Sequence, residues 1–88
     1  MKAVVTVLGK DRTGIIASVS GLLYQKGVNI LDISQTILSG MFTMIMLVDV
    51  GEGAQYDEVR DALLKMAEEM NLEIRMQRSD IFDAMHRI

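Results

Sequence analysis

The hydrophobic and polar positions of this chain repeat with two different periods, one typical of strands and one typical of helices. Residues 2–9 alternate and are rich in β-branched side chains, which predicts a strand. Apolar residues recur three and four positions apart in 15–26 and again in 55–71, which predicts two amphipathic helices. Three more strands are predicted at 29–38, 41–50 and 73–78. The expected order is therefore strand, helix, strand, strand, helix, strand.

Each predicted helix has one apolar stripe that should face the core of the domain. In the first helix the stripe consists of Ile15, Ile16, Val19, Leu22 and Leu23. In the second helix it consists of Tyr56, Val59, Leu63, Met66 and Met70. We expect Asp11 to cap the first helix with its carboxylate, and Gly27 to close it in the left-handed conformation. A tight turn at Ser39-Gly40 should join the two middle strands as a hairpin.

This order of elements predicts a ferredoxin-like α+β fold, a four-stranded antiparallel sheet with both helices on one face. The first and third strands should be central. The third strand is apolar on both sides, with Phe42, Met44, Met46 and Val48 on one side and Ile45 and Leu47 on the other. The sheet face opposite the helices should therefore be covered as well. The expected cover is a partner subunit or a short terminal helix at 80–87, which presents Ile81, Phe82 and Met85.

Composition places the chain among small globular domains and narrows its classes of partner. Its 88 residues fit one domain spanning 1–88, and 50 % of them are hydrophobic. Such an apolar load in a small body favours burial against a second subunit, so we expect a homodimer. A net charge of −3 argues against a nucleic-acid partner, which usually requires a basic face. No apolar run approaches ~20 residues and no signal-peptide pattern follows Met1, so we expect a cytoplasmic protein without a membrane segment.

The segment 9–37 carries the most informative local pattern. A polar turn, Asp11-Arg12-Thr13-Gly14, follows the first strand and runs directly into the first helix. A helix start leaves backbone N–H groups without partners, which suits a small anionic group. A purely structural interpretation is also open, with Asp11 as a cap, Arg12 as a surface charge and Gly14 as a residue that permits close packing.

The same segment resembles the ACT domain, a small regulatory module attached to many amino-acid-responsive enzymes. The resemblance lies in the D-R-x-G-I turn at 11–15 and in the G-x-N-I pattern at 27–30, and the order of elements matches across the whole chain. It extends to the small stand-alone members, the UPF0237-like family, which have a C-terminal S-D-I-F-D-A-M helix, here residues 79–85. The chain is also similar to the ACT segments of glycine cleavage regulators and formyltetrahydrofolate deformylases.

The resemblance implies a site for an effector amino acid between the start of the first helix and the start of the second strand, usually at a dimer interface. Carried over to this sequence, the implied ligand-binding residues are Asp11, Arg12, Thr13, Gly14, Ile15, Asn29 and Ile30. Helix N–H groups suit a carboxylate, Asn29 offers an amide, and Asp11 or Asp32 could take an ammonium group. Asn29 begins the strand that we expect to lie beside the turn. The implied function is a regulatory module that acts through a partner protein such as an enzyme.

A dimerisation or interaction module without a ligand is the alternative function. Ala17 and Gly21 lie four positions apart on the first helix, where small residues permit close approach of a second helix or of the domain's own sheet. Polar residues alternate on one face of the second strand, at Asp32, Ser34 and Thr36, as on a solvated edge strand. Because edge strands invite pairing with another chain, this strand is a candidate dimer seam.

An enzyme is the least expected class, and an acylphosphatase-like enzyme would be its form on this topology. The sequence places no nucleophile and base together, and Arg12 with the distant Asn29 matches an acylphosphatase cradle poorly. The chain has no cysteine, which excludes disulfides and thiolate metal sites. A solvated helix face explains the polar residues Asp80, Asp83 and His86, so we expect no metal, no cofactor and no catalytic residue.

Overall fold

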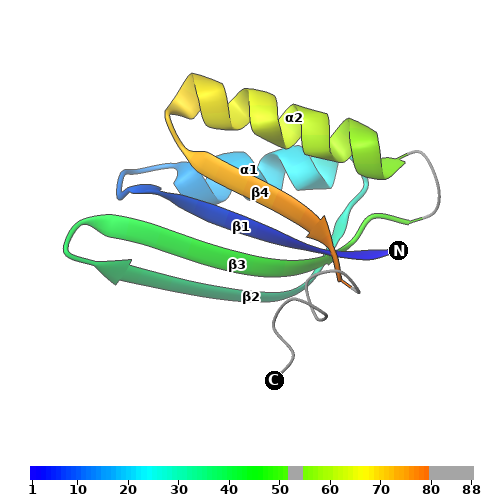
Figure 1. Ribbon diagram of the computed structural model, residues 1–88, viewed down its shortest axis with the longest axis horizontal. Helices are drawn as coiled ribbons and strands as arrows, with labels where there is room; N and C mark the ends of the chain where they lie inside the picture. The colour runs from blue at the N-terminus through cyan, green and yellow to red at the C-terminus, as the bar shows by residue number, and fades with distance from the viewer. Residues whose placement is uncertain (52–54, 80–88) are drawn as a thin grey trace.

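The computed structural model of the chain describes residues 1–51 and 55–79 (Figure 1). Its elements, in chain order, are β1 (Lys2–Lys10), α1 (Ile15–Gln25), β2 (Asn29–Leu38), β3 (Met41–Asp49), α2 (Gln55–Met70) and β4 (Glu73–Arg78). The strands form one antiparallel sheet in the order β2-β3-β1-β4. Both helices lie on the same face of this sheet (Figure 1). The predicted ferredoxin-like βαββαβ fold is confirmed, with β1 and β3 in the centre of the sheet.

The core lies between the sheet and the two helices. Val5 of β1 is paired with Met46 of β3 and with Met76 of β4, so the three side chains share one face of the sheet. Each of them is at most 8 % exposed. The helices contribute buried side chains at helical spacing, which are Ile15, Val19 and Leu23 from α1 and Val59, Leu63 and Ala67 from α2. Burial of one stripe on each helix therefore fixes both helices on the sheet.

The predicted helix stripes differ from the structure at two positions. Ile16 is 39 % exposed, because it lies on the flank of α1 that faces the edge strand β2 and not over the centre of the sheet. In α2 the buried stripe passes through Ala67, a small residue that a search for large apolar side chains overlooks. The partly buried members that pack against the core as predicted are Leu22, Tyr56, Met66 and Met70.

The start of α1 is not capped by Asp11, so that prediction is wrong. The helix begins at Ile15, and the residue before it, Gly14, is left-handed at φ 94° and provides no side-chain hydrogen bond. An N-cap directly precedes the first helical residue, and Asp11 lies too early in the chain for that role. Asp11 instead donates its backbone N–H to the Gly40 carbonyl at 2.8 Å, which joins the turn to the β2–β3 hairpin.

The two turns predicted from glycine positions are confirmed. Ser39 and Gly40 have positive φ angles of 52° and 79°, as expected for a two-residue hairpin between right-twisted strands. Gly27 follows α1 at φ 73°, and the Val28 N–H donates to the Leu23 carbonyl at 2.9 Å. That hydrogen bond satisfies one of the carbonyl groups that the end of a helix leaves open.

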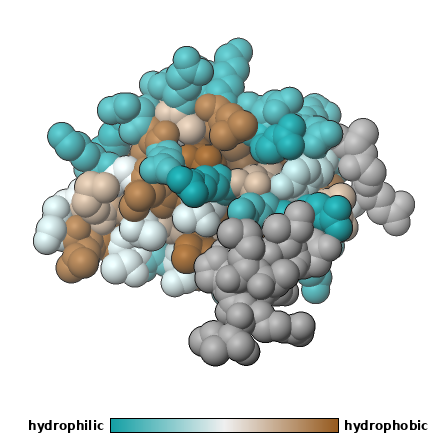
Figure 2. Space-filling model, viewed as in Figure 1, coloured by the Kyte–Doolittle hydropathy of each residue, from teal (hydrophilic) through white to brown (hydrophobic). Residues whose placement is uncertain are grey.

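The sheet face opposite the helices is partly apolar. Val4 is 7 % exposed on this face, while Leu8 and Ile45 are 37 % and 43 % exposed. Hydrophobic residues also reach the surface at the β2–β3 hairpin, on the left of Figure 2, where Leu38 is largely exposed. The terminal helix predicted at 80–87 as a cover for this face lies outside the described residues. Among the residues that are described, no helix is both long and apolar enough to cross a membrane.

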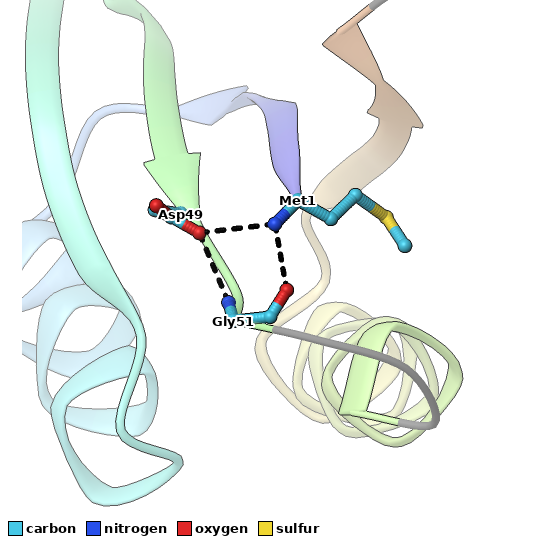
Figure 3. Close-up of polar contacts among 3 residues, drawn as sticks. All are labelled: Met1, Asp49 and Gly51. Atoms are coloured by element: carbon cyan, nitrogen blue, oxygen red, sulfur yellow. Dashed lines mark hydrogen bonds and ion pairs between the residues drawn. The ribbon is translucent and has the colours of Figure 1, made fainter.

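The end of the sheet at which β1 begins is held by the N-terminal ammonium group (Figure 3). This group donates to the Gly51 carbonyl at 2.7 Å and to Asp49 Oδ1 at 3.3 Å. The Gly51 N–H donates to the same carboxylate at 3.0 Å. The hydrogen bond from Gly51, followed by the Met1 ammonium, lowers the pKa of Asp49 because both stabilise the charged carboxylate. These contacts tie the end of β3 to the start of β1.

Candidate functional site

Two open cavities lie along the flank of α1 that faces β2. The first, which we call the turn cavity, has a volume of about 420 Å³ and is lined by residues 11–12 and 14–17 and by Gln35, Ile37 and Phe42. The second, the strand cavity, has a volume of about 560 Å³ and is lined by Ala17, Ser20, Gly21 and Tyr24 of α1 and by residues 28–30. Because Ala17 lines both, the two cavities are neighbours along the helix.

The start of α1 opens into the turn cavity with backbone N–H groups that no carbonyl of the helix accepts. The first bond within the helix runs from the Ser18 N–H to the Gly14 carbonyl, at 2.9 Å. The N–H groups of Ile15, Ile16 and Ala17 therefore have no partner inside the helix. The first turn of α1 has no acidic residue that would neutralise the positive end of the helix dipole. A small anion at this position would meet both donors and a favourable dipole.

The structure brings the turn residues 11–15 together, but it places Asn29 and Ile30 at the other end of the sheet. Asn29 is paired with Asp49 at one end of β3, whereas Lys10, just before the turn, is paired with Met41 at the other end. The length of β3 between these pairs is roughly 26 Å at ~3.3 Å per residue. The expectation that Asn29 lies beside the turn is therefore wrong within one chain, because α1 carries the chain back along the sheet before β2 begins.

The polar side chains of the turn are all solvent-exposed, but they have different contacts. Arg12 donates from Nη2 to the carbonyl of Met70, the last residue of α2. Its guanidinium group is thus bound to the second helix, although Arg12 also lines the turn cavity. Asp11 lines the same cavity and is exposed, as is Thr13. The turn therefore offers the cavity a set of backbone N–H groups together with the Asp11 carboxylate.

Gln35 and Ile37 line the turn cavity, although neither is among the site residues predicted from the sequence. Both are paired with core residues of β3, Gln35 with Met44 and Ile37 with Phe42, so they lie on the helix side of the sheet. The signal was present in the sequence, since Gln35 is a polar residue at the phase of the strand that faces the helices. The alternating polar residues from Asp32 to Thr36, on the opposite face of β2, are the more conspicuous pattern and obscure this signal.

The turn cavity can recognise a small zwitterion without covalent chemistry. The backbone N–H groups can hold a carboxylate, and the oxygen atoms of Asp11 and Gln35 can accept hydrogen bonds from an ammonium group. Within residues 1–51 and 55–79, no three potential metal ligands come together, and the polar residues at 80, 83 and 86 lie outside these ranges.

Elsewhere in the domain, burial raises the pKa of Tyr56, whose hydroxyl donates to the Met76 carbonyl at 3.0 Å. That contact holds α2 on β4.

An antiparallel sheet with two helices on one face, and an uncapped helix start beside an edge strand, define a small ferredoxin-like domain with an open site at the start of α1. The chain belongs to the ACT domain family, whose model matches residues 2–77. It is 46 % identical over 89 residues to a UPF0237 protein of Listeria innocua, and the match covers both chains completely.

Solved structures agree with this assignment. An ACT domain protein from Streptococcus pneumoniae superposes with a TM-score of 0.83 at 41 % identity, over 94 % of each chain. A candidate glycine cleavage system transcriptional repressor superposes with a TM-score of 0.82 at 31 % identity, over 89 % of this chain and 45 % of the other. The present chain therefore corresponds to about half of that longer protein.

Proposed function

We propose that this chain is a regulatory module that binds a small amino acid as a homodimer and signals the bound state to a partner protein such as an enzyme. The observation that carries the proposal is the uncapped start of α1, which opens into the turn cavity. A volume of about 420 Å³ lies within the usual range for small-molecule sites. The name of the structure that is 31 % identical connects its protein with glycine cleavage, which supports an amino acid as the effector.

The edge strand β2 supports the homodimer. It is hydrogen-bonded to β3 on one side, and every residue from 31 to 38 is exposed. Ile33 and Ile37 are 44 % and 55 % exposed on the side that faces α1. Pairing of β2 with β2 of a second copy would bury these side chains and the free edge of the strand together.

A two-fold axis between two paired β2 strands, one from each subunit, would also complete the binding site. In an antiparallel pair of identical strands, the start of one strand lies beside the end of the other. Leu38, at the end of β2, lies close to the turn because the Asp11 N–H is bonded to Gly40. Asn29 of the partner subunit would therefore approach the turn of the first subunit. The residues that one chain holds apart would meet across the interface.

Gly21 favours an interface over packing within the chain. Beyond the backbone of α1 itself and the two neighbouring residues, a Cβ atom built on Gly21 would meet no atom of the described residues within 4 Å. Glycine inside a helix costs about 0.5–1 kcal/mol relative to alanine, so some other contact should compensate for its presence. Close approach of the partner subunit's α1 along the flank formed by Ala17 and Gly21 would be the contact that compensates for this cost.

A thermal-shift screen of the twenty amino acids, followed by calorimetric titration, tests the proposal. A ligand that binds the native state alone raises the melting temperature. Asn29→Ala and Gln35→Ala should each weaken binding of the selected amino acid by about 1–3 kcal/mol, the usual cost of leaving one partner of a buried hydrogen bond unpaired. Gln25→Ala removes an amide from the exposed end of α1 that lines neither cavity, and is the matched control.

Two outcomes would contradict the proposal. If no amino acid raises the melting temperature, the domain is better explained as an interaction module without a ligand. If a ligand is found but both site variants bind it like the parent, the ligand lies elsewhere on the domain.

A further inference from the structure

Two turns that are far apart in the sequence lie against each other at one end of the domain. The turn between β1 and α1 and the turn between α2 and β4 share a cavity of about 310 Å³, lined by residues 10–12 and 70–72. Their contact is close, because a Cβ atom built on Gly9 would lie 2.5 Å from Leu72 Cδ2. A movement of either turn would therefore displace the other.

Arg12 supplies a cation that the last turn of α2 lacks. The last turn of α2 contains no basic residue of its own, and it contains Glu68 and Glu69. The carbonyl groups at the end of a helix carry partial negative charge and are stabilised by a nearby cation. Arg12 donates to the Met70 carbonyl from the other turn and so caps α2 from outside the helix.

The rest of the α2 terminus is closed by its own backbone. Asn71 is left-handed at φ 55°, and the Leu72 N–H donates to the Ala67 carbonyl at 2.8 Å. The Asn71 N–H approaches the Glu68 carbonyl at 3.4 Å. The Met70 carbonyl takes its hydrogen bond from Arg12.

We infer that Arg12 is a positioning residue that couples the start of α1 to the end of α2, so that the two turns open and close as one unit. Met70 also lines the groove between the two helices, together with Ser18, Leu22 and Met66. A displacement of Arg12 at the turn cavity would therefore move Met70 and alter the groove on the outer surface of the two helices. The coupling itself needs no ligand, and its use to report a bound amino acid rests on the proposed function.

Native-state hydrogen exchange of the full chain, measured by NMR without ligand, tests this coupling. The Ser18 amide reports the first turn of α1, and the Leu72 amide reports the end of α2. Arg12→Gln should accelerate exchange at both amides by roughly fivefold, the factor equivalent to about 1 kcal/mol for one hydrogen bond. Arg12→Lys should restore part of the protection, because an ammonium group can still stabilise the helix end.

Lys10→Gln is the matched control, since it removes the same charge two residues earlier and leaves the guanidinium–carbonyl contact in place. It should leave both amides unchanged. The inference is overturned if Arg12→Gln affects Ser18 alone, affects neither amide, or acts no more strongly than Lys10→Gln. Because none of these measurements uses an amino acid, their failure is distinct from a failed ligand screen.

Discussion

At the scale of single residues, Gly9 shows how a distant neighbour sets the size of a side chain. Leu72 Cδ2 would lie 2.5 Å from a Cβ atom at this position, closer than real Cβ atoms approach their neighbours. The backbone of Gly9 does not have the positive φ that favours glycine, so contact and not conformation is the reason for the small residue. The contact also explains why the β1–α1 turn can approach the end of α2.

Gly9→Ala should destabilise the domain by about 1–3 kcal/mol, because the Leu72 side chain must shift from its position against the core. In a Leu72→Ala background the obstructing atom is absent, and Gly9→Ala should then be neutral or stabilising by up to about 0.5–1 kcal/mol, since alanine suits a strand better than glycine. Urea unfolding of the four variants measures this coupling. An equal cost in both backgrounds would show that another neighbour limits the size of residue 9.

At the scale of elements, α1 has two sides with different tasks. One side buries Ile15, Val19 and Leu23 against the sheet and is required for folding. The flank with Ala17 and Gly21 borders the two cavities, and a Cβ at Gly21 would meet no atom of the other described elements within 4 Å. Substitutions on this flank should therefore act on association and leave folding intact.

Gly21→Ala should stabilise the folded monomer by about 0.5–1 kcal/mol, because alanine is the better helix former. The same change, and more strongly Gly21→Leu, should weaken the proposed dimer by separating the two α1 helices. Sedimentation equilibrium over a range of concentrations measures the association, and urea unfolding at low concentration measures the stability of the monomer. A Gly21→Leu protein that dimerises like the parent would exclude this flank from the interface.

At the scale of the whole molecule, the proposed site is divided between two copies. The turn with Gln35 comes from one chain, and Asn29 comes from the partner subunit, because the sheet holds Asn29 roughly 26 Å from the turn within a chain at ~3.3 Å per residue. A dimer with two-fold symmetry would contain two such sites.

Mixed dimers test the division directly. Asn29→Ala and Gln35→Ala homodimers each carry two defective sites. A mixed dimer should carry one intact site and one site that lacks both groups. Random pairing in an equimolar mixture makes half of the dimers mixed, so binding of the selected amino acid should return at about a quarter of the parental stoichiometry. Titration of refolded mixtures measures this recovery. If both groups act within one chain, mixing will restore nothing, and the two-fold arrangement will be wrong.

Local patterns in the sequence determined the order of the elements and most of their bounds. Strand period and turn glycines predicted β2 at 29–38 and β4 at 73–78, the ranges that the structure shows. Gly27 and Gly40 were predicted correctly because a left-handed turn residue leaves a signature at one position. The fold and the family could also be predicted from the sequence, because both depend on the order of these local signals along the chain.

The tertiary structure decided which of these signals meet. Periodicity shows which face of an element a residue occupies, but not how far along the sheet it lies, so the distance of Asn29 from the turn was predicted wrongly. The exposure of Ile16, the place of Gln35 in the turn cavity and the bond from Arg12 to Met70 all depend on elements separated in the chain. Contacts of this kind are set by the packing of one element on another, and a pattern along a single segment does not contain them.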